Sequence, residues 1–183
     1  MGLRTYGRGA AIAFELGKYF AIIAVVVLLI HFFAFTIFVV SGKSMESNFH
    51  NKEVVLINKF NLFTNRFARG APMVLRFPGD PQHKKYIKRL IGLPGETVEI
   101  KNNAIYINGD KLTESYISTD YSTEPLTNQN KWTLGTGEYF LVGDNRNNSS
   151  DSRVWGVAQR SDMVGPVVMI LIPRLEFTPA PMY

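Results

Sequence analysis

Ser44 is a candidate nucleophile because it lies in the short segment SGKSM (residues 41–45), directly after a long apolar run. A serine hydroxyl becomes strongly nucleophilic when a neighbouring base takes its proton, and histidine is the usual base. Neither His50 nor His83 lies in a pattern that marks a catalytic triad. A serine–lysine pair is the recognised alternative, so the lysines of the chain are the next candidates.

Lys88 is the lysine whose setting favours that role. With an ordinary pKa near 10.4, only about 0.1% of a lysine is neutral at physiological pH, and burial among apolar side chains lowers that pKa. In KKYIKRLIG (84–92), strand alternation places Tyr86, Lys88 and Leu90 on one face. A lysine whose stem lies on apolar surface and whose amine reaches water fits the same residues, so the pattern leaves both interpretations open.

An apolar run precedes the serine and predicts a transmembrane helix over residues 19–40. Its 22 residues span about 33 Å as a helix, enough to cross a hydrocarbon core of about 30 Å. The run is longer than the apolar stretch of a cleaved signal peptide, about 7–15 residues. Cationic Arg4, Arg8 and Lys18 precede it, so we expect residues 1–18 in the cytoplasm and Ser44 outside.

The remaining residues, 41–183, predict one extracytoplasmic β-rich domain. They contain short runs rich in β-branched and aromatic residues, each bounded by Gly, Pro, Asn or Asp, and no 12-residue window has helical periodicity. The runs are residues 53–60, 72–77, 84–92, 96–109, 138–144 and 164–172. The fold class is therefore mostly β, an antiparallel sheet on one N-terminal transmembrane helix. Residues 113–137 are polar and predict loops, and about 101–137 form a peripheral subdomain.

The segment KFNLFTNRFARG (59–70) alternates phenylalanines with cations and allows two interpretations. Aromatic rings and cations suit a membrane interface, where rings lie at headgroup depth. An ordinary loop that packs its phenylalanines under the sheet explains the same residues.

Composition excludes several classes of function. The net charge of +5 is a mild basic bias without the clustered stripe of a nucleic-acid binder. The chain has no cysteine and three histidines, which argues against a disulfide framework, a thiolate zinc site or a histidine-rich metal site.

Three segments in this order after an apolar N-terminal helix resemble bacterial type I signal peptidases: SGKSM (41–45), YIKRLIGLPGE (86–96) and GDNRNNSSDSRVWG (143–156). The short chain with one apolar segment is more similar to the Gram-positive members. The resemblance implies a membrane-bound serine–lysine endopeptidase that removes signal peptides from exported preproteins. It implies as partners those signal peptides and the lipid bilayer, and it implies neither a metal nor an organic cofactor.

The resemblance also implies roles for individual residues. Ser44 becomes the nucleophile, Lys88 the general base, and Ser149 the serine whose hydroxyl orients the lysine amine. The charged residues of the third segment are Asp144, Arg146, Asp151 and Arg153, of which Asp144, Asp151 and Arg153 hold the active-site loop by ion pairing. From the residues alone, this segment is also explained as a polar loop rich in Asx turns.

The resemblance further implies pockets for small substrate side chains, lined by Val40, Met45, Phe49, Tyr86 and Ile87. Core packing explains the same five residues. For the oxyanion, the backbone N–H of Ser44 is one candidate donor. Gly42 stands where some members have a serine with a donor hydroxyl, so the second donor is not specified.

Two segments depart from the family pattern. Ser47 and Asn48 stand where the family usually has Pro-Thr, and Ala71 follows Arg69-Gly70 where it usually has Asp. The first change predicts a looser turn after the nucleophile, and the second removes a possible ion pair. Two other functions remain open: a catalytically silent membrane-tethered module that binds exported peptides or a partner protein, and a self-cleaving serine–lysine regulator. The second is disfavoured because such regulators are soluble.

Overall fold

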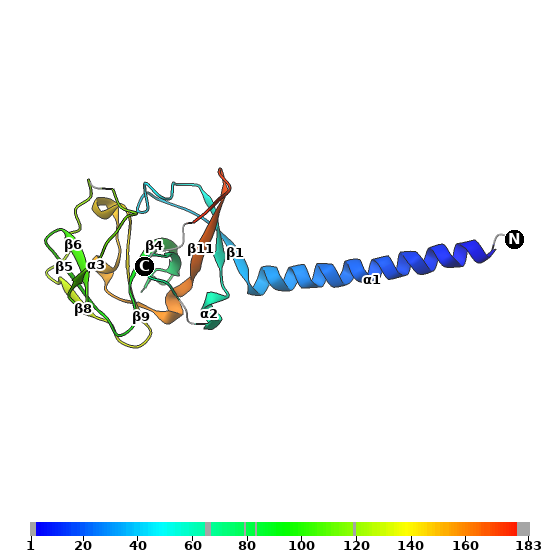
Figure 1. Ribbon diagram of the computed structural model, residues 1–183, viewed down its shortest axis with the longest axis horizontal. Coiled ribbons are helices and arrows are strands. Elements are labelled where there is room, and N and C mark those ends of the chain that lie inside the picture. The colour runs from blue at the N-terminus through cyan, green and yellow to red at the C-terminus, as the bar shows by residue number, and fades with distance from the viewer. Residues whose placement is uncertain (1–2, 65–66, 79, 83, 119, 179–183) are drawn as a thin grey trace.

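A computed structural model describes the chain except residues 1–2, 65–66, 79, 83, 119 and 179–183. A β-rich body lies at one end of a single long helix, which projects away from it (Figure 1). His83, and Arg66 within the segment 59–70, lie outside the described residues.

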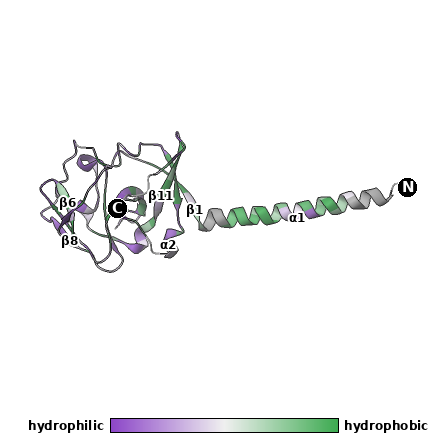
Figure 2. Ribbon diagram, in the orientation of Figure 1, coloured by the Kyte–Doolittle hydropathy of each residue, from purple (hydrophilic) through white to green (hydrophobic). Residues whose placement is uncertain are grey.

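Helix α1, Leu3–Phe33, is a straight, solvent-exposed rod of 31 residues, about 46 Å long. The segment Gly9–Leu29 of this helix is long and apolar enough to cross a membrane, and Figure 2 shows the hydrophobic stretch along the helix. Nothing in the body packs over this stretch. A helix in this setting hides all of its backbone hydrogen bonds while presenting apolar side chains outward, which suits a bilayer.

The helix boundaries differ from the predicted span of 19–40. The helix begins sixteen residues earlier, at Leu3, and ends at Phe33. After Ala34, residues Phe35–Val39 form strand β1, which pairs with β2 from Phe35↔Asn58 to Val39↔Val54. The prediction was wrong here because Phe, Thr, Ile and Val are as suited to a strand as to an apolar helix, and only the distant β2 supplies a pairing partner.

The main sheet has eight strands in the order β1-β2-β11-β3-β4-β9-β10, with β12 paired to β11. All its pairings are antiparallel, as the sequence predicts. The strands are β1 Phe35–Val39, β2 Val54–Asn58, β3 Pro72–Arg76, β4 Lys85–Gly92, β9 Glu138–Val142, β10 Ala158–Gln159, β11 Met163–Ile172 and β12 Glu176–Phe177.

Strand β11 joins the two parts of this sheet, pairing with β3 through Met163–Pro166 and with β2 through Val167–Ile172. The register shifts between Met163 and Gly165. Gly165 has φ of +147°, and a Cβ there would lie 2.5 Å from the carbonyl oxygen of Asn58. Glycine therefore permits the bulge that bends β11 from one partner to the other.

A second antiparallel sheet has four strands in the order β7-β6-β5-β8. Strands β6, β7 and β8 lie in the predicted peripheral subdomain, about residues 101–137, and β5 comes just before it. It contains β5 Thr97–Lys101, β6 Ala104–Ile107, β7 Asp110–Lys111 and β8 Lys131–Thr133. Asn102 and Asn103 both have positive φ in the β5–β6 connection, which matches a type I′ hairpin turn. The long connection from β7 to β8 contains Glu114, which binds Arg146, and Tyr116, whose ring lies against Arg89 of β4.

Short helices complete the body: α2 Asn61–Thr64, α3 Ser152–Trp155, and the single 3₁₀ turns Arg146–Asn148 and Arg160–Asp162. Three apolar clusters form the core. One lies around Val55, Val74 and Ile87, one around Met73, Leu90 and Leu141, and one around Ile100, Ile105 and Phe140 in the second sheet.

Core packing explains part of residues 59–70, and the membrane-interface interpretation of this segment stays a prediction. Phe67 is buried, with its ring edge-on to Tyr139 at 5.5 Å and the Arg160 guanidinium over it, and Arg69 forms an ion pair with Glu96. Phe60 is 59% exposed. Core packing thus accounts for the second half of the segment, while Phe60 at its beginning presents its ring to solvent.

Candidate active site

Ser44 and Lys88 lie together although they are 44 residues apart in the chain. Ser44 is in the turn that follows β1, and Lys88 is on β4; Lys88 Nζ is hydrogen-bonded to Ser44 Oγ at 2.5 Å. Only 2% of Lys88 is exposed. The solvent-facing alternative for this lysine is therefore wrong, because β4 is covered on both faces from Ile87 to Gly92.

The surroundings of Lys88 make its neutral amine easier to form than that of an exposed lysine. Burial lowers the pKa of Lys88 from its ordinary value to about 8, the nearby carboxylates of Asp151 and Asp144 oppose this shift, and Arg153 adds to it. Among the described residues, no carboxylate oxygen lies within 4.0 Å of Lys88 Nζ. Desolvation therefore outweighs the distant negative charges.

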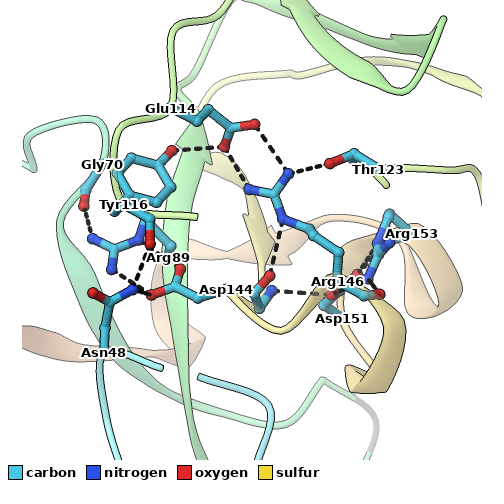
Figure 3. Close-up of polar contacts among 11 residues, drawn as sticks. Asn48, Gly70, Arg89, Glu114, Tyr116, Thr123, Asp144, Arg146, Asp151 and Arg153 are labelled. Atoms are coloured by element: carbon cyan, nitrogen blue, oxygen red, sulfur yellow. Dashed lines mark hydrogen bonds and ion pairs between the residues drawn. The ribbon is translucent and has the colours of Figure 1, made fainter. Parts of the chain in front are cut away.

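Asp144 is buried near Lys88, where it binds Arg89. The guanidinium of Arg89 donates through Nε at 2.6 Å and through a terminal nitrogen at 2.5 Å to the two carboxylate oxygens, and donates also to the carbonyl of Gly70 (Figure 3). The sequence analysis missed Arg89. Its signal was present, since a cation between Lys88 and Leu90 in a strand without exposed faces requires a buried partner.

Asp151 and Arg153 bind each other, as the resemblance implies. Arg153 donates to both Asp151 oxygens at 2.8 Å, and its backbone N–H is capped by the same carboxylate at the start of α3. Asp151 also accepts from the backbone N–H of Gly143. The loop is therefore held by two ion pairs that do not share a partner: Asp151 with Arg153, and Asp144 with Arg89.

Arg146 is buried and binds Glu114 of the peripheral segment. Its two terminal nitrogens donate to the two Glu114 oxygens at 3.0 and 2.5 Å, and one donates also to the hydroxyl of Thr123 (Figure 3). Its Nε donates to the carbonyl of Gly143. Glu114 and Thr123 lie in the segment assigned to loops, where no sequence pattern marks them as partners of an arginine.

Ser149 lies at the site without the predicted contact to the lysine. Its Oγ is buried and has no hydrogen-bond partner among the described residues. The hydroxyl faces Gly143, where an added Cβ would also lie 2.5 Å from the Ser44 carbonyl oxygen. The hydrogen bond from Ser149 to Lys88 is therefore not formed in this structure, although the two segments are in close contact.

Gly42 adopts φ of +93°, and its N–H donates to the side-chain oxygen of Asn51 at 3.1 Å. This amide is already engaged, so it is not free to bind an oxyanion. Asn51 was not singled out from the sequence.

The five expected substrate-binding residues divide into two groups. Val40, Met45, Phe49 and Ile87 are at most 3% exposed and belong to one apolar cluster. Tyr86 is 37% exposed and lies with its ring centroid 5.9 Å from Lys88 Nζ. Core packing explains the first four, while Tyr86 borders the site.

A cavity of about 420 Å³ lies beside the nucleophile turn but is lined by neither Ser44 nor Lys88. Its lining includes Asn48, Arg89 and Tyr116. In the part of the chain that the structure describes, no group of three or more His, Asp or Glu side chains could hold a metal ion.

The comparisons with known proteins agree on one family. The family model described as signal peptidase, peptidase S26, matches residues 13–172. Signal peptidase I S of Bacillus subtilis strain 168 is 41% identical over 170 residues, which cover 88% of this chain and 90% of that protein. Signal peptidase I P of Bacillus subtilis subsp. natto is 34% identical over 163 residues, covering 85% and 87%. A signal peptidase I crystal structure from Enterococcus faecalis V583 has a TM-score of 0.46 and 32% identity, covering 55% of this chain and 96% of that one.

Proposed function

Because this chain belongs to the signal peptidase family, peptidase S26, we propose that it is a membrane-bound serine endopeptidase that removes N-terminal signal peptides from exported preproteins. Ser44 is the nucleophile and Lys88 is the general base. The family supports the peptidase activity and the class of substrate. The assignment of these two residues rests on one observation: the 2.5 Å contact between their side chains in a buried setting.

The reaction follows from the protonation state of Lys88. The neutral amine takes the proton of Ser44 Oγ as the oxygen attacks the scissile carbonyl carbon. The tetrahedral intermediate collapses to an ester on Ser44, and the lysine ammonium gives its proton to the departing amine. Water then attacks the ester, again with Lys88 as the base, and releases the acid product.

The developing oxyanion requires N–H or O–H donors aimed at it before the reaction begins. The backbone N–H of Ser44 is the donor we assign. Gly42 does not supply the second donor, since it has no hydroxyl and its N–H donates to Asn51.

The apolar stretch of helix α1, Gly9–Leu29, is the proposed membrane anchor, with the chain before it in the cytoplasm and the β-rich body outside. The structure places only Ala34 between α1 and β1, so the body begins directly at the end of the helix (Figure 1). Ser44 follows the last helical residue by eleven positions rather than by the four expected. Tethering the enzyme at the membrane keeps it near substrates whose cleavage sites emerge there, which raises their effective concentration.

Substrate binding by strand addition is the mode we expect, with an extended segment beside the sheet and small side chains facing the surface around Tyr86. Met45 and Ile87 adjoin Ser44 and Lys88 in the chain and belong to one buried apolar cluster. We expect them to close the floor of the binding surface, so that large substrate side chains are excluded.

A cleavage assay with purified protein in detergent and a preprotein substrate tests this proposal. We expect Ser44→Ala and Lys88→Ala each to lower kcat/KM about 10³-fold or more. Lys85→Ala is the matched control because Lys85 is on the same strand and exposed, and it should retain the wild-type rate. Equal cleavage by the wild type and the Ser44 variant, or none by the wild type, would favour the silent peptide-binding module.

A further inference from the structure

Asn48 makes contacts that its position in the turn after the nucleophile does not require. Its side-chain nitrogen donates to Asp144 Oδ2 at 2.8 Å and to the carbonyl oxygen of Tyr116 at 2.6 Å (Figure 3). A primary amide offers two N–H donors on one nitrogen, and both are used here. A hydroxyl side chain at this position, as in the family pattern, offers one.

The Asp144 contact connects Asn48 to the strand of the base. Asp144 Oδ2 accepts at once from Asn48 and from Arg89, the residue that follows Lys88 on β4. An ionised carboxylate is acceptor-only and holds several donors in fixed directions. A shift of Asn48 therefore moves the carboxylate that fixes Arg89, and Arg89 is joined to Lys88 by one peptide bond.

The turn itself connects Asn48 to the nucleophile. The backbone N–H of Asn48 donates to the carbonyl of Met45 at 3.0 Å, which closes the turn of residues 45–48 directly after Ser44. On the other side, the N–H of Asn145 donates to the Ser44 carbonyl at 3.1 Å. The nucleophile turn is thus attached to the Asp144–Asn145 segment at both of its ends.

The Tyr116 contact adds the peripheral segment to this arrangement. The Tyr116 ring lies 4.0 Å from the Arg89 guanidinium carbon, and its hydroxyl donates to Glu114, which binds Arg146. Figure 3 shows Asn48, Arg89, Asp144 and Tyr116 as one connected group. The same peripheral residue therefore covers the guanidinium and accepts from the amide.

We propose that Asn48 is a positioning residue for the Ser44–Lys88 pair, acting through Asp144 and the Tyr116 carbonyl. This inference rests on the proposed function. It replaces the expectation of a looser turn, since the amide supplies a restraint where proline is absent. Misplacement of reacting groups by about 1 Å can lower a rate about 10²-fold, so loss of the amide should act on the chemical step.

The first test measures kcat and KM for preprotein cleavage by Asn48→Ala and Asn48→Thr. We expect Asn48→Ala to lower kcat about 10²-fold with KM within about twofold. Asn48→Thr, which keeps one donor toward Asp144, should recover at least about tenfold of that loss. Gln129→Ala is the matched control: it removes one amide contact to a backbone carbonyl in the peripheral sheet and should leave both constants unchanged.

The second test needs no turnover. In the Ser44→Ala background, labelling of lysines by an acylating reagent is followed by mass spectrometry, with exposed Lys85 as internal reference. Lys88 should label slowly, and Asn48→Ala should raise the labelling rate of Lys88 relative to that of Lys85, while the Tm falls by no more than in Asn48→Thr.

If the wild type cleaves no preprotein but Lys88 labelling responds to Asn48→Ala, the proposed function fails and the positioning role stands. Wild-type kcat in Asn48→Ala, or Lys88 labelling unchanged by it, would overturn the inference.

Discussion

Two adjacent residues of β4, Lys88 and Arg89, are both buried cations but have different partners. Lys88 and Arg89 are 2% and 6% exposed. Arg89 is bound by both oxygens of Asp144 and by the Gly70 carbonyl. Lys88 has only the Ser44 hydroxyl at hydrogen-bonding distance and, among the described residues, no carboxylate in contact.

The difference separates a cation held by a carboxylate, Arg89, from one that we propose as the general base, Lys88. A buried charge is tolerated when it is paired and hydrogen-bonded, and otherwise the group tends to become neutral. Arginine cannot lose its proton in this range and therefore needs Asp144, whereas lysine can. Two neighbouring cations on one buried strand therefore differ in charge behaviour, because Arg89 has a carboxylate partner and Lys88 has only a hydroxyl.

The largest expected effect comes from replacing Lys88 by arginine, the residue type at position 89. Lys88→Arg keeps a cation of similar reach but removes the neutral state, since a guanidinium stays protonated. We expect kcat/KM to fall at least about 10³-fold. The measurement is preprotein cleavage together with the Tm of the variant. Substantial activity in this variant would mean that Lys88 is not the base.

A second variant removes the structural cation instead. Arg89→Met leaves Asp144 buried without its ion-pair partner, which should lower the free energy of unfolding by about 3–5 kcal/mol. Denaturant unfolding measures this, with Arg69→Met as the control, because the Arg69–Glu96 pair is more exposed, at 17% for each side chain. A loss no greater than that of the control would show that Arg89 is not essential to the fold.

The smallest effect concerns pH. Only the neutral form of Lys88 is a base, so activity should fall as pH drops below about 8, the pKa that burial gives this amine. About half of the amine is neutral at that pH and about a tenth one unit lower. The Asp144 carboxylate favours the ammonium, so Asp144→Asn should move the acidic limb to lower pH. A pH-rate profile of kcat/KM checks both statements, and a flat acidic limb would contradict a lysine base.

Much of the β body was predictable because its strands are short, β-branched and bounded by turn residues. The type II turn at LPGE follows from Pro94 and Gly95, and Gly95 has the positive φ that this turn needs. The boundary between α1 and β1 was not predictable. An apolar run that continues through Phe35–Val39 carries no local signal for the change from exposed apolar helix to paired strand.

The site divides in the same way. Ser44 and Lys88 could be found from residue type and strand alternation with a family resemblance, as could the Asp151–Arg153 pair. Asn48, Arg89 and Glu114 could not be assigned partners, because each binds a residue 32 to 96 positions away. Ser149 was assigned a contact with Lys88 that the structure does not contain.

The sequence by itself determined the apolar helix, the antiparallel β class and the residue types that can carry serine–lysine chemistry. These follow from composition and short-range periodicity, which act within a few residues. Only the tertiary structure decided which cation is held by a carboxylate and which has its pKa lowered by burial, since that depends on where distant carboxylates lie. Because β4 is buried on both faces, each of its cations needs either a charged partner or a lowered pKa. The packing of residues 44–48, 114–116 and 143–153 around the strand gives Arg89 the carboxylate of Asp144 and gives Lys88 only the hydroxyl of Ser44.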